Sequence, residues 1–184
     1  KSLKKCKVCG NEDLTKVLTL QEQYLSPTFV KSNKDNKLAS IKSPLTLVLC
    51  DKTKNKNNCG LLQLLEITDQ DLLYKRYFYR SATNDTMRSD LNNLVSQALD
   101  IARPDKGDVI VDIGSNDCTL LNFYKNKFDL IGFEPAENIR HIDEGNKITI
   151  INNYFNSSEF KKMNKSKAKI ITSCAMFYDL EDPR

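Results

Sequence analysis

The sequence has no long apolar run. None of its hydrophobic stretches approaches the roughly 20 residues that a helix needs to cross a bilayer, so we expect no membrane span. The basic segment 1–7 is not followed by an apolar stretch, so no secretory signal is visible and the default expectation is a cytoplasmic protein. Hydrophobic residues make up 40% of the 184 positions and charged residues 28%, proportions typical of folded globular proteins.

The sequence also lacks a concentrated basic surface. The net charge is only +4, and the Lys and Asn residues are spread through polar segments instead of clustering with aromatic residues. This pattern is a compositional bias and does not indicate nucleic-acid binding, so we expect no nucleic-acid partner.

Cysteines are frequent, and four of the six lie in the first 59 residues. Cys6 and Cys9 form a Cys-x-x-Cys pair before Gly10, a spacing that lets one tight turn offer two sulfurs to one ion. Cys50 and Cys59 would supply the second pair, with the polar segment 51–58 as an insertion. We predict a structural zinc site, because four thiolates leave no coordination position open for catalysis and nothing else suggests electron transfer.

Two other states of these cysteines are possible. Disulfides are disfavoured in a reducing cytosol. Free buried thiols would not explain why the cysteines are paired in a segment with so little core of its own.

The pattern of apolar residues divides the chain into three parts. We predict a zinc-binding module over 1–68, a helical linker with a Tyr-rich loop over 69–104, and an incomplete Rossmann-like domain over 105–184. In the last part, β-rich runs at 109–113, 129–133, 148–151 and 169–172 alternate with helical stretches, which is typical of parallel βαβ units in an α/β fold. Sheets of this kind normally have more than four strands, so we expect the sequence to be part of a longer protein.

The segment VIVDIGSND at 109–117 predicts a buried strand that ends in a turn and then a helix. Gly114 would let the backbone pass close to a ligand, and Asn116 or Asp117 could cap the helix through Leu120, Leu121 and Phe123. Ligands of open α/β sheets bind at the carboxyl ends of the strands, so this turn is a candidate binding site.

A second predicted strand ends in Glu134, 20 positions after Gly114. A carboxylate at this place can accept hydrogen bonds from both hydroxyls of a ribose. The alternative is that Glu134 caps a helix that follows Pro135.

The turn lacks the glycines of a dinucleotide site. The G-x-G-x-x-G fingerprint would require glycine where the sequence has Asn116 and Thr119, and Asp117 would add negative charge beside a phosphate. An acidic turn instead suits a cofactor that has a cationic end and no phosphate, such as S-adenosylmethionine. This favours methyl transfer over hydride transfer.

Taken together, these motifs resemble the zinc-binding nucleotide-sugar C-methyltransferases of deoxysugar pathways, in which a zinc module precedes a Rossmann-like S-adenosylmethionine domain. The resemblance is carried by Cys6-x-x-Cys9, Cys50 with Cys59, LQEQYLSPTF at 20–29, Tyr77-x-Tyr79-x-Ser81, Met87 and VDIGSND at 111–117. It implies roles for further residues: Asp112, Gly114, Ser115 and Asn116 at the methionine end of the cofactor, Glu134 at the ribose, Asn153 at the adenine edge, Ser173, Cys174 and Ala175 beneath the methyl donor, and Tyr77 and Tyr79 in the sugar site.

Two positions depart from the family pattern. Cys118 stands where the family usually has a third glycine. The Glu-His pair that serves the family as candidate base has no counterpart, because the only histidine, His141, is expected on the surface of a polar helix after the second strand.

We therefore predict part of an S-adenosylmethionine-dependent methyltransferase that acts on carbon of a nucleotide-linked keto-deoxysugar through an enolate. Tyr79 is a candidate hydrogen-bond donor to the enolate oxygen, and this part of the chain lacks the base. Two alternatives stay open at this point: a zinc-ribbon interaction module that binds RNA or a partner protein through the Lys-rich loop 52–56, and an NAD-type oxidoreductase.

Overall fold

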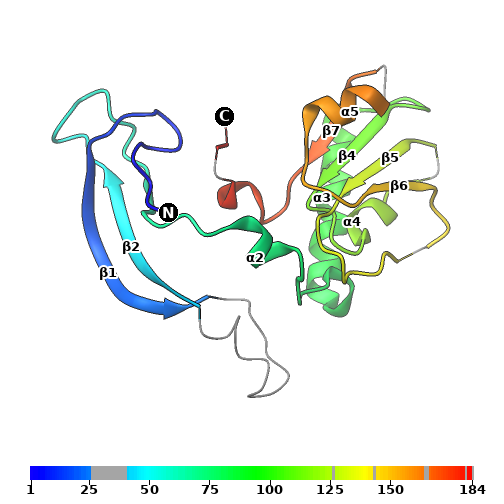
Figure 1. Ribbon diagram of the computed structural model, residues 1–184. Coiled ribbons are helices and arrows are strands. Elements are labelled where there is room, and N and C mark those ends of the chain that lie inside the picture. Colours follow the sequence, from blue (N-terminus) through cyan, green and yellow to red (C-terminus); the bar gives the residue numbers. More distant parts are fainter. Residues whose placement is uncertain (26–40, 126, 143, 164–165, 181, 184) are drawn as a thin grey trace, which may run out of the picture. The chain divides into compact units, whose positions relative to one another are not determined.

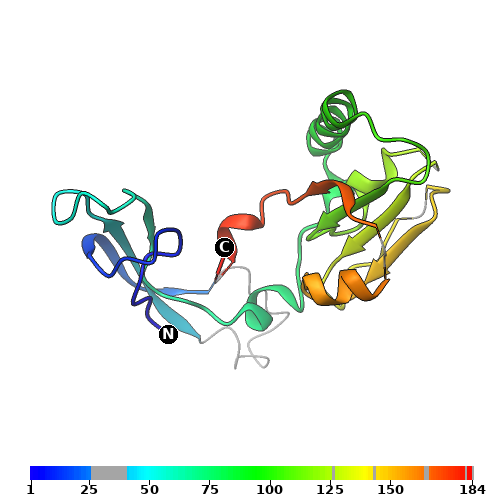
Figure 2. The same ribbon diagram turned by 90° about the horizontal axis from the view of Figure 1, so that it is seen from above.

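The computed structural model describes residues 1–25, 41–125, 127–142, 144–163, 166–180 and 182–183. The chain forms two compact units, Lys1–Leu73 with Tyr178–Arg184 and Tyr74–Phe177 (Figures 1 and 2). Part of the LQEQYLSPTF motif, from position 26 onward, lies outside the described residues. The predicted three-part division at 68 and 104 stays a prediction.

The first unit is built on a small antiparallel sheet. Its strands are β1 (Leu14–Tyr24), β2 (Lys42–Cys50) and β3 (Leu62–Leu64), in the order β1-β2-β3. Among the described residues of this unit, the buried apolar side chains are Cys6, Val48 and Cys50. Since two of these three are cysteines, the sheet has almost no hydrophobic core, which is the condition under which small modules depend on a metal or another cross-link.

Three helical elements lead from the first sheet to the second. They are α2 (Gln70–Tyr74), the 3₁₀ turn η1 (Ser81–Thr83) and α3 (Asp85–Ala102). The side chain of Asn84 accepts a hydrogen bond from the amide of Met87 and so caps α3. At the other end, Arg103 adopts the left-handed conformation and its amide donates to the carbonyl oxygen of Leu99.

The second unit contains a four-stranded parallel sheet. Its strands are β4 (Val109–Ile113), β5 (Asp129–Phe133), β6 (Ile148–Ile151) and β7 (Ala168–Thr172), in the order β6-β5-β4-β7. The predicted α/β, Rossmann-like class is confirmed, and β7 begins one residue earlier than predicted. The chain steps outward from β4 to β6 and then returns to the other side of β4, so the carboxyl end of β4 lies at the point where the strand order reverses.

Helices cover both faces of this sheet (Figure 2). Leu91 and Val95 of α3 pack with Ile110 on one face, together with residues of the short helix α4 (Thr119–Asn122). On the other face, Phe160 of α5 (Ser157–Met163) packs against a cluster that includes Val111 and Ile131. The strand residues alternate between the two clusters, as the twofold period of a β-strand requires. No helix of the described residues is long and apolar enough to span a bilayer.

The prediction of a helix after Pro135 is wrong. The described residues between β5 and β6 form turns and extended segments, and His141 is exposed in one of them. The side chain of Glu134 accepts from the amide of Ala136, and local contacts of this kind compete with helix formation. The side chain of Asn138 bonds to the backbone of the distant Tyr77. The amide of Ile142 also donates to the carbonyl oxygen of Asp117, which ties this segment to the turn after β4.

Candidate metal centre and cofactor site

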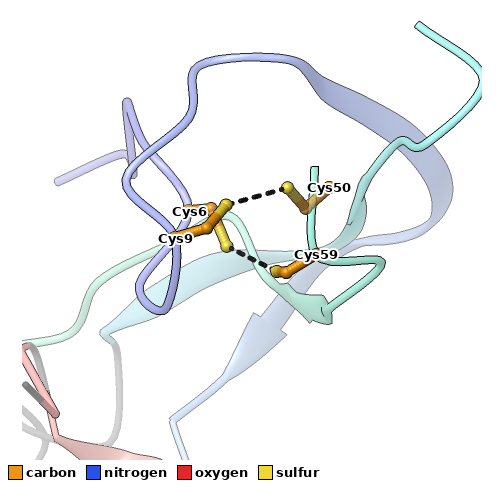
Figure 3. A group of neighbouring side chains, drawn as sticks. All are labelled: Cys6, Cys9, Cys50 and Cys59. Atoms are coloured by element: carbon orange, nitrogen blue, oxygen red, sulfur yellow. Dashed lines mark hydrogen bonds between the residues drawn. The ribbon is translucent and has the colours of Figure 1, made fainter. Parts of the chain in front are cut away.

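The four amino-terminal cysteines converge on one point from two segments of the chain (Figure 3). Their sulfur atoms all lie within 4.8 Å of one another, with 3.4 Å between Cys6 and Cys59 and 3.5 Å between Cys9 and Cys50. Tetrahedral zinc with bonds of about 2.3 Å would hold its sulfurs about 3.8 Å apart, so the cluster is close to that geometry. All six cysteines are free thiols in the structure, so the cluster is not a pair of disulfides.

Each cysteine pair is closed by the glycine that follows it. The amide of Gly10 donates to the carbonyl oxygen of Cys6 at 2.9 Å, and the amide of Gly60 donates to that of Cys50 at 3.1 Å. Both glycines have positive φ, 76° and 81°, where a side chain would be strained. The second pair thus ends in the same closed turn as the first, although eight residues separate its cysteines instead of two.

Internal hydrogen bonds keep the loop 51–58 compact, so that it fits between Cys50 and Cys59. Asp51 accepts hydrogen bonds from the amide and hydroxyl of Thr53. The side chain of Asn58, only 2% exposed, donates to the carbonyl oxygen of Asp51 at 2.7 Å and accepts from Asn11 at 2.8 Å. Asn58 therefore joins the two ends of the loop and links it to the first cysteine pair. The sequence predicted the insertion but not this anchor.

The local electrostatics suit a metal with thiolate ligands. Burial opposes ionisation of Cys6, but hydrogen bonds from the amides of Cys9 and Val8 outweigh it and lower its pKa to about 6. Burial raises the pKa of Cys50 to about 12. Zinc would supply the positive charge that keeps a coordinated thiol deprotonated even where burial opposes it. The residues present therefore fit a structural zinc ion.

The turn after β4 is the second candidate site. Gly114 has a φ of 76°, and a Cβ placed on it would lie 3.3 Å from Cγ of Met176, which follows β7. The amides of Gly114 and Ser115 both donate to the carbonyl oxygen of Phe133 at the end of β5. The turn is therefore bonded to the neighbouring strand, and its one glycine lies next to the side chain of Met176.

Three carboxyl groups are buried around this turn: Asp112 at 3% exposure, Asp117 fully buried and Glu134 at 5%. Asp112 accepts a hydrogen bond from the hydroxyl of Thr172 at 2.7 Å. Burial raises the pKa of Asp112 to about 7, and the nearby charge of Glu134 adds to the effect. Burial also raises the pKa of Cys118 to about 12, with further contributions from all three carboxylates. The turn is therefore an acidic environment.

Glu134 faces the turn. Its Oε2 accepts from the amide of Asn116 at 2.7 Å, and its Oε1 accepts from the amide of Ala136 at 2.9 Å. Each carboxylate oxygen can accept two hydrogen bonds, so both retain acceptor capacity for a ligand. The alternative role as a helix cap is wrong, because the described residues between Glu134 and β6 form no helix.

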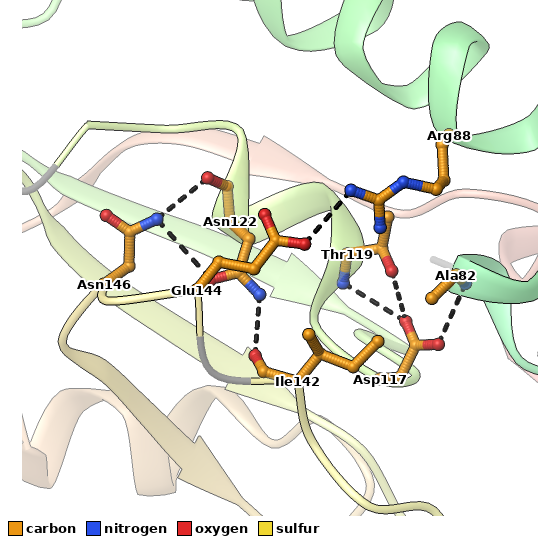
Figure 4. Close-up of polar contacts among 8 residues, drawn as sticks. All are labelled: Ala82, Arg88, Asp117, Thr119, Asn122, Ile142, Glu144 and Asn146. Carbon is orange, nitrogen blue, oxygen red and sulfur yellow. Dashed lines mark hydrogen bonds and ion pairs between the residues drawn. The ribbon is translucent and has the colours of Figure 1, made fainter. Parts of the chain in front are cut away.

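The turn also holds the Tyr-rich segment. The side chain of Asn116 donates to the carbonyl oxygen of Tyr79 and accepts from the amide of Ser81, both at 3.1 Å. Asp117 accepts from the amide of Ala82 at 3.0 Å and, through its other oxygen, from the amide and hydroxyl of Thr119 at the start of α4 (Figure 4).

Asn138 makes a second attachment to the same segment. Its side chain accepts from the amide of Tyr77 at 2.9 Å and donates to the carbonyl oxygen of Tyr77 at 2.8 Å. These roles of Asn116, Asp117 and Asn138 were not predicted from the sequence. Polar side chains in a tightly packed turn do indicate backbone partners, but their partners lie too far along the chain to be named from the sequence.

The remaining predicted residues follow the other strands. Asn153 is the second residue after β6, is exposed, and accepts from the amide of Tyr154. Its neighbour Asn152 donates to the carbonyl oxygen of Glu134 at 2.7 Å. Ser173, Cys174 and Ala175 follow β7, and the hydroxyl of Ser173 lies 3.7 Å from the sulfur of Met176. Since parallel strands end at the same edge of a sheet, the turn, Glu134, Asn153 and residues 173–175 share one edge. Their contacts with a cofactor stay a prediction.

Comparison with known proteins agrees with both halves of the chain. Residues 6–74, which contain all four clustered cysteines, match the family model Methyltransf_13, described as "Putative zinc binding domain". The chain is also 24% identical over 135 residues to C-methyltransferase NovU of Streptomyces niveus. That alignment covers 73% of this chain and 30% of NovU, so the chain spans less than a third of the length of that relative.

These matches confirm the resemblance found in the sequence. The chain is similar to a C-methyltransferase over most of its length, and its cysteine cluster lies inside the matched zinc-binding domain.

Proposed function

We propose that the complete protein is an S-adenosylmethionine-dependent C-methyltransferase, and that the turn after β4 holds the cofactor. The observation that carries this proposal is the set of three buried carboxyl groups, Asp112, Asp117 and Glu134, around one glycine turn at the carboxyl edge of a parallel sheet. When bound, the cofactor supplies a methyl group on a cationic sulfur. Where they are ionised, the carboxyl groups of this chain favour such a cation, because opposite charges attract strongly where water is excluded.

The same residues disfavour a dinucleotide. A pyrophosphate needs free backbone amides and no negative charge beside them. Here the amide of Asn116 already donates to Glu134, and Asp117 is buried in the turn. These contacts argue against the NAD-type oxidoreductase. Glu134 instead suits the hydroxyls of a ribose, which lack charge and can use the lone pairs left on its two oxygens.

The substrate that we propose is a nucleotide-linked keto-deoxysugar, methylated on carbon next to its ketone. Tyr77 and Tyr79 lie in the segment that Asn116 and Asn138 attach to the cofactor turn and to the loop after β5. A tyrosine hydroxyl in this segment would stabilise the negative charge that develops on the substrate oxygen. His141 is not our candidate base, because it is exposed and its Nδ1 lies beside the thiol of Cys118. We expect the base in the part of the longer protein that this chain does not include.

Isothermal titration calorimetry tests the cofactor assignment. We expect S-adenosylmethionine and S-adenosylhomocysteine to bind this chain and NAD to give no heat. Glu134→Gln should weaken binding of S-adenosylhomocysteine by roughly tenfold or more, since hydrogen bonds to a charged group contribute about 1.5–3 kcal/mol. Glu137→Gln, at an exposed position three residues away, is the matched control and should bind as the unmodified chain does. Absence of heat with both S-adenosyl compounds, or binding of NAD in their place, would contradict the proposal.

A further inference from the structure

Asn116 bonds to two segments of the chain, one before it and one after it in the sequence. Its amide donates to Glu134 at 2.7 Å, on the side where we place the ribose. Its side chain bonds to the carbonyl oxygen of Tyr79 and to the amide of Ser81, both in the Tyr-rich segment. The two partner segments are separated from Asn116 by 18 residues in one direction and by 35 to 37 in the other.

The backbone at Asn116 is left-handed, with a φ of 51°. This conformation is uncommon for residues other than glycine and persists where surrounding contacts determine it. Here three hydrogen bonds fix one residue, and two of them belong to its side chain. A displacement of residue 116 would therefore move the backbone of Tyr79 and Ser81 with it.

We propose that Asn116 is a positioning residue that links occupation of the cofactor turn to the placement of Tyr79. This inference rests on the proposed function. A ribose whose hydroxyls donate hydrogen bonds to Glu134 changes the contact that holds the amide of Asn116, and the side chain of Asn116 passes this change to the Tyr-rich segment. Cofactor binding thereby sets the geometry of the substrate side. By linkage, a substrate bound against Tyr79 alters the affinity for the cofactor by the same factor.

Asn138 offers a matched comparison. It holds the same segment through two hydrogen bonds to the backbone of Tyr77, at 2.9 and 2.8 Å, but it belongs to the loop after β5 and not to the turn after β4. If the contacts of the segment merely keep it folded, loss of either asparagine should have the same effect. If Asn116 transmits occupation of the turn, only its loss should break the link.

The sequence contains no tryptophan, so Tyr79→Trp introduces a single fluorescent reporter at the position of interest. In this parent variant we expect S-adenosylhomocysteine to change the tryptophan emission, with saturation at the Kd that calorimetry gives. Asn116→Gly in the same background removes the side chain without straining the left-handed backbone. It should keep measurable binding by calorimetry but lose at least half of the emission change. Asn138→Ala should keep the full change.

The outcomes separate the two proposals. Heat of binding without an emission change in the parent overturns the link, and so does a full change in Asn116→Gly or an equal loss in Asn138→Ala. Absence of heat with both S-adenosyl compounds in the chain with Tyr79 intact overturns the proposed function instead. If Asn116→Gly itself fails to bind, Asn116→Asp replaces it, because this variant keeps the acceptor for Ser81 and removes only the donor to Tyr79. A full emission change in Asn116→Asp would then overturn the link.

Discussion

Gly132 of β5 lies against the side chain of Ser115 in the turn after β4. A Cβ placed on Gly132 would stand 2.6 Å from Oγ of Ser115 and 3.0 Å from its Cβ. Gly132 pairs with Asp112 in the sheet. Strand β5 therefore leaves space for Ser115 beside the residue that carries the buried carboxyl group of Asp112. The absence of a side chain at Gly132 is what allows the turn to pack back onto the sheet.

Gly132→Ala should therefore displace Ser115 and distort the turn. We expect it to lower the free energy of unfolding by about 1–3 kcal/mol, as overpacking usually does, and to weaken binding of S-adenosylhomocysteine. Urea unfolding and calorimetry measure the two effects. The double variant Gly132→Ala with Ser115→Gly removes both clashing atoms and should recover part of the stability. An unchanged free energy of unfolding in Gly132→Ala would contradict the prediction, because it would mean that the turn can move without cost.

The cysteine cluster should hold one zinc ion per chain. Cys50→Ser should abolish zinc binding and unfold the first unit, because Val48 is the only buried apolar residue of that unit, among those described, that is not a cysteine. Metal analysis by mass spectrometry and the amide dispersion in NMR spectra test this. Cys174→Ser, which alters a cysteine outside the cluster, should retain the metal. A folded first unit without metal would contradict the assignment.

Asn58→Ala should loosen the second cysteine pair. The change leaves the carbonyl oxygen of Asp51 and the side chain of Asn11 without the contacts that Asn58 gives them, at a cost of about 1–3 kcal/mol. We expect the affinity for zinc to fall, as measured by competition with a chelator. Asn57→Ala, at the exposed neighbouring position, is the control and should bind zinc normally. Equal affinities in the two variants would refute the role of Asn58 as an anchor.

The raised pKa of Asp112 predicts a pH-dependent stability. An unfolded aspartate titrates near a pKa of about 3.9, whereas burial raises that of Asp112 to about 7. Between these values the folded state holds a proton that the unfolded state lacks, so stability falls as the pH rises from about 4 to 7 and then levels off. Asp112→Asn removes this contribution. The unmodified chain should lose on the order of 2 kcal/mol relative to the variant between pH 5 and pH 8, as measured by urea unfolding. Parallel profiles would show that Asp112 is ionised throughout.

The sequence predicted the strands of the parallel sheet well, because β-branched residues such as Val109 to Val111 and Ile148 to Ile151 form short runs bounded by polar segments. The bounds of three of the four strands agree with the structure. The cysteine cluster could also be predicted, since Cys-x-x-Cys spacing encodes a local geometry. In both cases the information lies within a few neighbouring residues.

Long-range packing could not be predicted in the same way. The apolar pattern after the turn suggested a helix that includes Phe123, but α4 ends at Asn122, and the amides of Phe123 and Tyr124 turn back to the carbonyl oxygens of Leu120 and Leu121. The requirement for glycine at position 132 depends on Ser115, which is distant in sequence. Such requirements arise only when separate segments meet.

The closed turn at the second cysteine pair determines which positions of the loop 51–58 can vary among homologous proteins. The contact between Gly60 and Cys50 sits at the base of the loop, and the anchor Asn58 sits just inside it. Lengthening a loop beyond such a base costs little, about 0.6 kcal/mol for each doubling. Homologous proteins should therefore tolerate insertions and substitutions at the tip freely while the base stays fixed. The tip is accordingly a suitable position for grafting a peptide tag or a label.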